Sequence, residues 1–210
     1  FQEYVAHEAD LCVKLPDNVS TMEGALIEPL AVGFHAAMQG GARAGQSAVV
    51  LGSGCIGLVT MMALKAMGVS KVYVVDIMEK RLEKALELGA DGVINGSKTD
   101  AVEEVMRLTE GKGCDLAIET AGTQITTVQA IHMTKKGSNI VLVGYSRSGE
   151  MTLPMSLVLD KELTFKTVFR YRHIYPMAIE AVAAGEVNLK GIVTEVFDLD
   201  DVQKAMDLSV

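Results

Sequence analysis

Several residue types that mark specialised protein classes are scarce or missing in this sequence. It contains no tryptophan, aromatic residues make up only 5% of it, and there are three cysteines in 210 residues. Cys12, Cys55 and Cys114 are odd in number and widely spaced, which excludes a disulfide framework and a Cys-x-x-Cys zinc motif. We expect them to be reduced thiols buried in the core of a cytoplasmic protein.

Long apolar runs and an excess of positive charge are also lacking. No stretch approaches the ~20 apolar residues that a membrane-spanning helix needs. The formal net charge is −8, which disfavours binding to nucleic acid or to an anionic membrane. We therefore expect a globular protein whose partner is a small molecule, with no nucleic acid and no membrane.

What the sequence does contain, from about residue 45, is an alternation of short Val/Ile/Leu-rich runs with helical patterns. Continuous apolar runs are typical of parallel strands that helices bury on both faces. The sequence therefore predicts an α/β fold, a doubly wound parallel sheet of six strands in the order 3-2-1-4-5-6. The predicted strands cover residues 46–51, 71–76, 92–94, 115–119, 139–143 and 163–169.

Capping residues place the other elements. Thr123 is expected to cap a helix that runs to Lys135 and Lys136, whose charges suit the negative end of a helix. A further strand is predicted at 192–197, and a helix is predicted to start at Asp198. Neither of these, nor the first 20 residues, fits the strand–helix repeat, so both ends are expected to belong to a second domain.

The first predicted strand leads into a glycine-rich turn with the spacing G-x-G-x-x-G. In a dinucleotide-binding unit the first glycine allows the tight turn, the second lets a pyrophosphate approach the backbone, and the third lets the helix pack closely. The start of that helix offers free N–H groups to phosphates. The residues of this turn are Gly52, Ser53, Gly54, Cys55, Ile56 and Gly57.

An acidic residue completes the pattern. Asp76 ends the second apolar run, 19 residues after Gly57, where a carboxylate accepts hydrogen bonds from the adenosine ribose. Because it would repel a 2′-phosphate, the expected cofactor is NAD rather than NADP. A turn without a ligand and a methyltransferase-like nucleotide site are the alternatives.

Six segments together resemble the zinc-dependent medium-chain dehydrogenase/reductase superfamily, in particular the sorbitol and related polyol (L-iditol) dehydrogenases. They are VKLPD at 13–17, GALIEPL at 24–30, the glycine turn, ETAG at 119–122, VLVG at 141–144 and VFRY at 168–171. The resemblance implies a parent enzyme that oxidises a secondary alcohol of a sorbitol-like polyol to a ketone, with hydride transfer to NAD and with zinc.

The resemblance also implies a domain organisation. Residues 1–24 would be a remnant of the catalytic (GroES-like) domain, 25–175 the NAD-binding Rossmann domain, and 176–210 a return segment towards the catalytic domain. The cysteine and His-Glu pair that bind the catalytic zinc in this family are absent. The fragment alone is therefore expected to be inactive.

Glu28 is the candidate metal residue. Pro29 suits the first position of a helix over about 29–39, which would place Glu28 at the positive helix end, where a carboxylate is favoured even without a function. The resemblance implies that Glu28 binds zinc, directly or through water, in the full-length enzyme only. It also implies that Arg170, and more weakly Tyr171, contact the substrate, with a salt bridge between domains as the alternative role of Arg170.

The resemblance assigns the cofactor contacts as well. Arg81 would lie beside the adenosine, with an exposed surface cation as the alternative. Three residues after the fourth strand, Thr120, Ala121 and Gly122, would face the adenosine half. The nicotinamide carboxamide would meet the backbone of Val143, Gly144 and Tyr145 and of Val168, Phe169 and Arg170.

Other activities remain open at this point. The same machinery could act on threonine or a simple alcohol, the chain could belong to a zinc-free NADPH reductase, or it could be a non-catalytic NAD-binding module. The strand at 163–169 is expected to lie at the sheet edge, where uncovered strands pair. We therefore expect a homodimer through this strand, which could form half of a tetramer in the parent.

Overall fold

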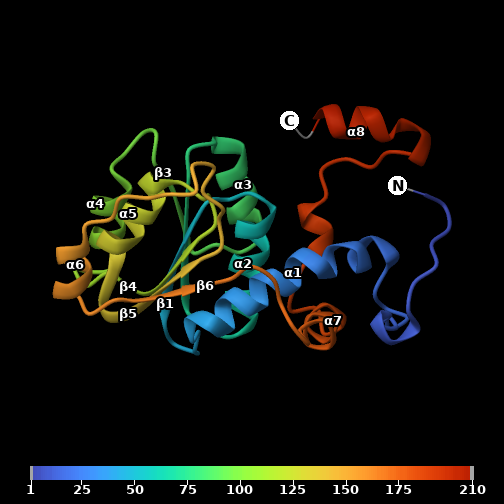
Figure 1. Cartoon of the computed structure of the whole chain (residues 1–210), viewed down its shortest axis with the longest axis horizontal. Helices are drawn as coiled ribbons and strands as arrows, with labels where there is room; N and C mark the ends of the chain where they lie inside the picture. Colours follow the sequence, from blue (N-terminus) through green and yellow to red (C-terminus); the bar gives the residue numbers. More distant parts are fainter. Residues whose placement is uncertain (1, 209–210) are drawn as a thin grey trace.

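A single parallel sheet organises the chain. The computed structural model describes residues 2–208, and its six strands lie in the order β3-β2-β1-β4-β5-β6 (Figure 1). This confirms the predicted fold class and strand order. The strands are β1 (Ser47–Leu51), β2 (Lys71–Asp76), β3 (Gly92–Asn95), β4 (Cys114–Glu119), β5 (Thr134–Leu142) and β6 (Thr164–Thr167).

Helices cover both faces of this sheet because its strands are apolar on both sides. Successive residues of β1 belong to different cores: Val50 packs in one cluster and Val49 in the other. One face is covered by α1 (Thr21–Gly40), α2 (Cys55–Ala66), α3 (Glu79–Glu87) and α7 (Tyr175–Ala183). The other is covered by α4 (Ala101–Leu108), α5 (Gln124–Met133) and α6 (Met155–Asp160).

The helix that carries Glu28 begins earlier than predicted. Ser20 caps α1 in a reciprocal capping box with Glu23, and Pro29 lies inside the helix. The prediction that Glu28 heads a helix was therefore wrong. The capping box satisfies the first amides of the helix and fixes its start at Ser20. Pro29 lacks the amide for one hydrogen bond further along the same helix.

The predicted end of the helix after Thr123 was also wrong. Thr123 does cap α5, but the helix stops at Met133 and β5 starts directly at Thr134. The sequence predicted that Lys135 and Lys136 provide the positive charge at the end of this helix. Lys161 provides it instead, because its Nζ donates to two carbonyls of the last turn at 2.8 and 2.9 Å. A residue distant in sequence thus completes the helix end.

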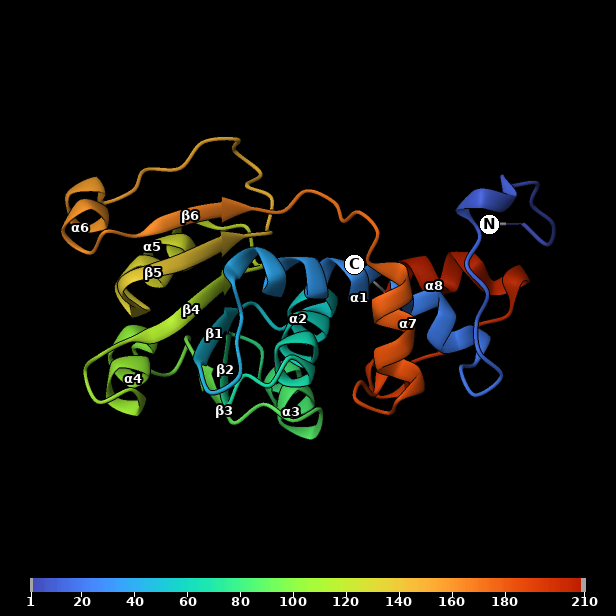
Figure 2. The ribbon, with the colours of Figure 1, turned by 90° about the horizontal axis from the view of Figure 1, so that it is seen from below.

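The segments before α1 and after α7 lie on the same side of the molecule, away from the sheet. In Figures 1 and 2 the N-terminal segment, with the short 3₁₀ helix η1 (Ala9–Leu11), lies on the same side as α7 and α8 (Val202–Leu208). The strand predicted at 192–197 is absent from the described residues, where η2 (Leu189–Ile192) leads into backbone outside the sheet and then η3 (Leu199–Asp201). The helix predicted after Asp198 is present.

The exposure of the cysteines and the lengths of the helices test two further predictions. Cys114 is buried as expected, but Cys12 and Cys55 are exposed, because Cys12 precedes the folded core and Cys55 opens α2 at the glycine turn. Between residues 2 and 208, no helix combines the length and the apolar composition needed to cross a bilayer.

Candidate functional site

The glycine turn joins β1 to α2 at the carboxyl edge of the sheet. Gly52 has φ +97°, a conformation that residues with a Cβ rarely adopt. A Cβ on Gly57 would lie 1.9 Å from the Gly52 carbonyl oxygen, so α2 can start this close to the strand only with glycine. Gly52 and Gly57 therefore have the geometric roles that the sequence predicted.

Gly54 differs from Gly52 and Gly57 because the space that a side chain would occupy there is open. A Cβ placed there meets no atom within 4 Å, and its φ of −74° is ordinary. Within the described chain, no side chain caps the start of α2. The turn thus presents open backbone and a helix N-terminus, which suits an anion such as a pyrophosphate.

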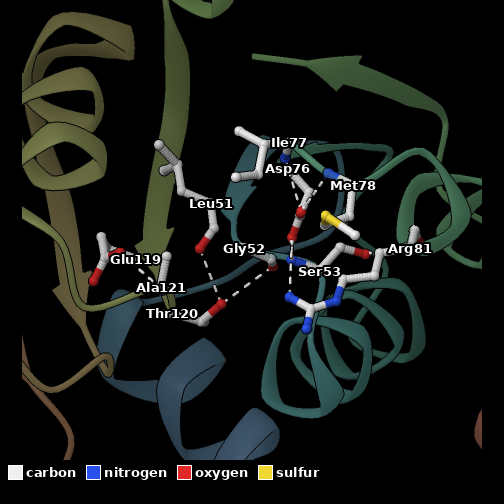
Figure 3. A network of polar contacts seen from close by, with 10 residues as sticks. All are labelled: Leu51, Gly52, Ser53, Asp76, Ile77, Met78, Arg81, Glu119, Thr120 and Ala121. Carbon is white, nitrogen blue, oxygen red and sulfur yellow. Dashed lines mark hydrogen bonds and ion pairs between the residues drawn. The ribbon is translucent and has the colours of Figure 1, made fainter. Parts of the chain in front are cut away.

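Asp76 lies at the end of β2 beside this turn, and its carboxylate binds the turn directly. Oδ2 accepts from the amide of Ser53 at 2.7 Å, and Oδ1 accepts from the amides of Ile77 at 2.7 Å and Met78 at 2.9 Å (Figure 3). The guanidinium of Arg81 lies 3.9 Å from Oδ2. The residue is 9% exposed, so this acid is fixed rather than mobile.

Ser53 and Arg81 are tied to each other as well. The buried Ser53 hydroxyl donates to the backbone carbonyl of Arg81 at 3.0 Å, as Figure 3 shows. The guanidinium of Arg81, which pairs with Asp76 at 3.9 Å, is more than half exposed and accessible to a ligand. The start of α3 is thereby fastened to the glycine turn.

A cavity of about 430 Å³ opens between these groups and the loop after β4. Gly52, Asp76, Arg81 and Ala121, four of the predicted cofactor residues, line it. The sequence did not single out several other lining residues. Four of them lie just after β2 or β3 or at the start of α5, and this position was the available signal. The lining residues outside the predicted set are Val75, Ile77, Gly96, Thr123, Ile125, Thr126 and Gln129.

The loop after β4 forms the wall between the two halves of the crevice. The Thr120 hydroxyl donates to the carbonyl of Leu51 at 2.9 Å, so the loop is fastened to β1. Ala121 and Gly122 donate their amides to the Glu119 carboxyl at 2.8 and 2.9 Å. Gly122, with φ +69°, packs against the backbone of Tyr145.

The residues predicted to hold the nicotinamide gather on the other side of that loop. Six of them line or adjoin a second cavity of about 450 Å³ at the carboxyl ends of β5 and β6. The Tyr145 and Phe169 rings meet edge-on with centroids 6.1 Å apart, and the Arg170 guanidinium lies 5.4 Å from the Phe169 centroid. Lining residues from the predicted set are Val143, Gly144, Tyr145, Val168 and Phe169.

Glu28 and Tyr171 lie in contact, as their shared assignment to one site requires. The Tyr171 hydroxyl donates to Oε1 of Glu28 at 2.8 Å and lies 2.8 Å from the Tyr175 hydroxyl. Burial raises the pKa of Tyr171, and the hydrogen bonds with Tyr175 and Glu28 raise it further. Tyr175 and Glu28 also line a separate cavity of about 270 Å³.

The donor set for a metal is incomplete in this chain. Within residues 2–208, no three His, Cys, Asp or Glu side chains are grouped so that they could hold a metal ion. Glu28, whose described partner is a tyrosine hydroxyl, does not fit a zinc site by itself. We therefore derive no chemistry from a metal held by these residues alone.

A doubly wound sheet in this order, with a glycine turn and an acid at its switch point, defines a Rossmann-type nucleotide-binding domain. Residues 55–184 match the zinc-binding dehydrogenase family, and the chain belongs to that family. The superfamily suggested by the sequence motifs is thereby confirmed.

Curated relatives agree with this assignment. The chain is 44% identical over 207 residues to the zinc-type alcohol dehydrogenase-like protein YdjJ of Escherichia coli K12, covering 99% of this chain and 59% of the relative. It is 42% identical over 207 residues to human sorbitol dehydrogenase, covering 97% and 57%. It is 37% identical over 211 residues to L-idonate 5-dehydrogenase of Vitis vinifera, covering 98% and 57%.

Solved structures give the same fold. An Escherichia coli oxidoreductase/dehydrogenase of unknown specificity superposes with a TM-score of 0.93 at 43% identity, over 97% of this chain and 58% of that one. An Escherichia coli CFT073 alcohol dehydrogenase complexed with NADH gives 0.89 at 28% identity, over 96% and 59%. A Sinorhizobium meliloti zinc-binding dehydrogenase bound to NADP gives 0.80 at 28%, over 85% and 53%.

The relatives and solved structures are much longer than this chain. The chain spans less than three fifths of each relative and structure named here. What the relatives do as whole proteins is therefore carried to this chain only as a proposal.

Proposed function

We propose that this chain is the NAD-binding part of a zinc-type dehydrogenase that oxidises a secondary alcohol of a sorbitol-like polyol to a ketone. The observation that carries the proposal is the fixed carboxylate of Asp76, hydrogen-bonded to the glycine turn at the mouth of the 430 Å³ cavity. NAD, when bound, supplies the hydride acceptor. The residues of the chain bind and orient it.

The contacts we assign follow the crevice from one side to the other. The open backbone at Gly54 and the start of α2 receive the pyrophosphate. Asp76 accepts hydrogen bonds from the adenosine ribose, and Arg81 and the loop of Thr120, Ala121 and Gly122 border the adenosine half. The cavity at the carboxyl ends of β5 and β6 receives the nicotinamide.

The preference for NAD over NADP follows from charge. Asp76 is nearly buried, so its negative charge is poorly screened where a 2′-phosphate would lie. Structural neighbours bound to NADH and to NADP both exist, and the exposed Arg81 could pair with a phosphate. An NADPH-using reductase is therefore the second candidate.

Calorimetric titration of the chain with NADH and with NADPH separates these candidates. We expect NADH to bind at least about tenfold more tightly, the ratio that 1.4 kcal/mol of charge repulsion produces. The variant Asp76→Ser should reduce this ratio, whereas Glu79→Gln, at an exposed carboxylate nearby, should not. Equal affinities would favour the second candidate, and no binding of either would reject a dinucleotide site.

The catalytic half of the proposal concerns the full-length protein. There Glu28 contributes to the zinc site, directly or through water, while Arg170 and Tyr171 contact the polyol hydroxyls. Residues 2–208 contain no complete metal site, and we propose that the chain is inactive by itself. Relatives named for sorbitol and for L-idonate make a polyol screen of the full-length protein, with and without chelator, the direct test.

We further propose that two chains associate through β6. Its neighbour in the sheet lies on one side only, so its other edge is open. Leu159 of α6 and Phe169, which follows β6, have exposed apolar side chains. The resulting homodimer is tested below.

A further inference from the structure

Glu119 is a buried acid that the proposed function does not use. It ends β4 at the point where the strand order reverses, and its side chain is 0% exposed. Burying a carboxyl group is costly unless its oxygens find partners. The partners of Glu119 therefore indicate what its side chain does.

One carboxyl oxygen is fully engaged by a single loop. Oε1 accepts from the amides of Ala121 and Gly122 at 2.8 and 2.9 Å and from the Thr126 hydroxyl of α5 at 2.8 Å. These three donors span the loop that follows β4 and the first turn of the next helix. The carboxyl group thus fixes the path of the chain across the crevice.

The other oxygen faces a second loop. Oε2 is buried without a hydrogen-bond partner among the described residues. A Cβ built on Gly144 would lie 2.8 Å from Oε2 and 2.1 Å from the Gly122 amide nitrogen. The loop of Gly144 therefore packs directly against both groups. The Glu119 backbone carbonyl accepts from the amides of Val143 and Gly144 at 2.8 and 3.1 Å. One residue therefore contacts both loops.

These two loops form the wall between the cavities. Ala121 and Thr123 line both the 430 Å³ cavity beside Asp76 and a cavity of about 330 Å³ that Tyr145 also lines. A dinucleotide that crosses the switch point must pass this wall. A small displacement of the wall would change both cavities together.

We propose that Glu119 is a positioning residue of the dinucleotide cleft, whose carboxyl group sets the loop of Ala121 and Gly122 against the loop of Gly144. This inference rests on the proposed cofactor role of the cleft. Because the side chain is buried and Oε2 has no hydrogen-bond partner among the described residues, the neutral acid is the form that fits. Its function is therefore geometric and does not require a negative charge.

Two measurements on the chain test this: amide hydrogen exchange at Ala121 and Gly122, and NADH affinity by calorimetry. Glu119→Gln keeps an oxygen for the three donors, so both should stay within about twofold of the original. Glu119→Leu leaves the donors unpaired, so exchange should accelerate and NADH binding should weaken, each by about tenfold or more. The rescue by glutamine separates positioning from charge.

Further variants make every result decisive. If Glu119→Leu does not fold, Glu119→Asp, which withdraws the acid by one methylene, should show the same two losses in milder form. Glu110→Gln, at an exposed carboxylate paired with Lys112, should change neither readout. The proposal would be overturned if the leucine or aspartate variant showed unchanged amide exchange. It would also be overturned if amide exchange in the glutamine variant were as fast as in the leucine variant.

Failure of the proposed function gives a different result. If the unaltered chain binds no NADH, the cofactor site is rejected, while hydrogen exchange still reports whether Glu119 positions the loop. If NADH binds and only the exchange prediction fails, the cofactor site stands and the role of Glu119 does not.

Discussion

At the scale of single residues, the glycine turn offers a matched pair of substitutions. In Gly57→Ala the added Cβ would lie 1.9 Å from a carbonyl oxygen, whereas in Gly54→Ala it would lie in open space. We expect Gly57→Ala to lower the free energy of unfolding by about 2 kcal/mol or more. Gly54→Ala should change it by less than about 0.5 kcal/mol. Chemical denaturation measures both.

The same pair separates folding from binding. Because the Gly54 side faces the proposed pyrophosphate, Gly54→Ala should weaken NADH binding by about tenfold while the protein stays stable. Wild-type affinity in this variant would mean that the phosphates lie elsewhere.

Glu119 gives a pH prediction whose sign follows from burial. Burial raises the pKa of this carboxyl above its ordinary value of 4.5, against the opposing hydrogen bonds from Thr126, Gly122 and Ala121. The unfolded chain therefore loses this proton at a lower pH than the folded chain. Stability from this group is complete below about pH 4.5 and is lost as pH rises through the raised folded pKa.

Denaturation of the chain and of Glu119→Gln over a pH series checks this. The difference in unfolding free energy between them should shift in favour of the glutamine variant as pH rises, because glutamine has no proton to lose. The side chain and amides that contact the carboxyl group are uncharged, so the difference isolates this residue. A difference that does not depend on pH would contradict the raised pKa.

The contrast between Asp76 and Glu119 shows what sequence can supply at this scale. Asp76 was predictable because its role depends on spacing from a glycine motif. Glu119 belongs to the ETAG motif at 119–122, but its role depends on the amides of Ala121 and Gly122 and on Gly144 in another loop. Such a role appears only when β4 and β5 are placed side by side.

At the scale of elements, the end of α5 depends on one distant cation. Lys161 donates to the carbonyls of Ile131 and His132, which the helix itself leaves without partners. Lys161→Met should lower the free energy of unfolding by about 1–2 kcal/mol. Lys98→Met, which removes a cation paired with Glu79 at the surface, should cost under about 1 kcal/mol. Equal losses in thermal unfolding would refute the capping role.

The predicted ends of helices and strands were correct where the local sequence signals agree. They were wrong where other contacts determine the end of the element. The strands from 46–51 to 115–119 were placed to within one residue. Pro29 carried a start signal that the Ser20–Glu23 capping box overrides, and the end of α5 is set by Lys161. Both errors arose because one local feature was used to place the helix end, while another interaction determines it.

At the scale of the whole molecule, the doubly wound sheet was predictable and the ends of the chain were not. Sheet order follows from apolar runs and general topology rules, which act within the repeat. Residues 192–197 have a strand-like pattern, but among the described residues no partner strand lies beside them. A strand pattern alone cannot form a ladder.

The association through β6 makes the last prediction. The amide of Val168 donates to the Leu142 carbonyl of β5, and backbone groups of successive strand residues point to opposite sides. The Thr167 amide therefore points to the open edge, where it is available to a second chain. Light scattering at tens of micromolar should show a dimer.

Thr167→Pro removes that amide without removing a bond to β5, so it should shift the chain towards monomer. Thr167→Ala keeps the amide and should stay dimeric, which separates backbone pairing from side-chain effects. A monomer in the unaltered chain would contradict the proposed association. A dimer that persists in the proline variant would place the interface elsewhere, with the exposed Leu159 of α6 as the next site to substitute.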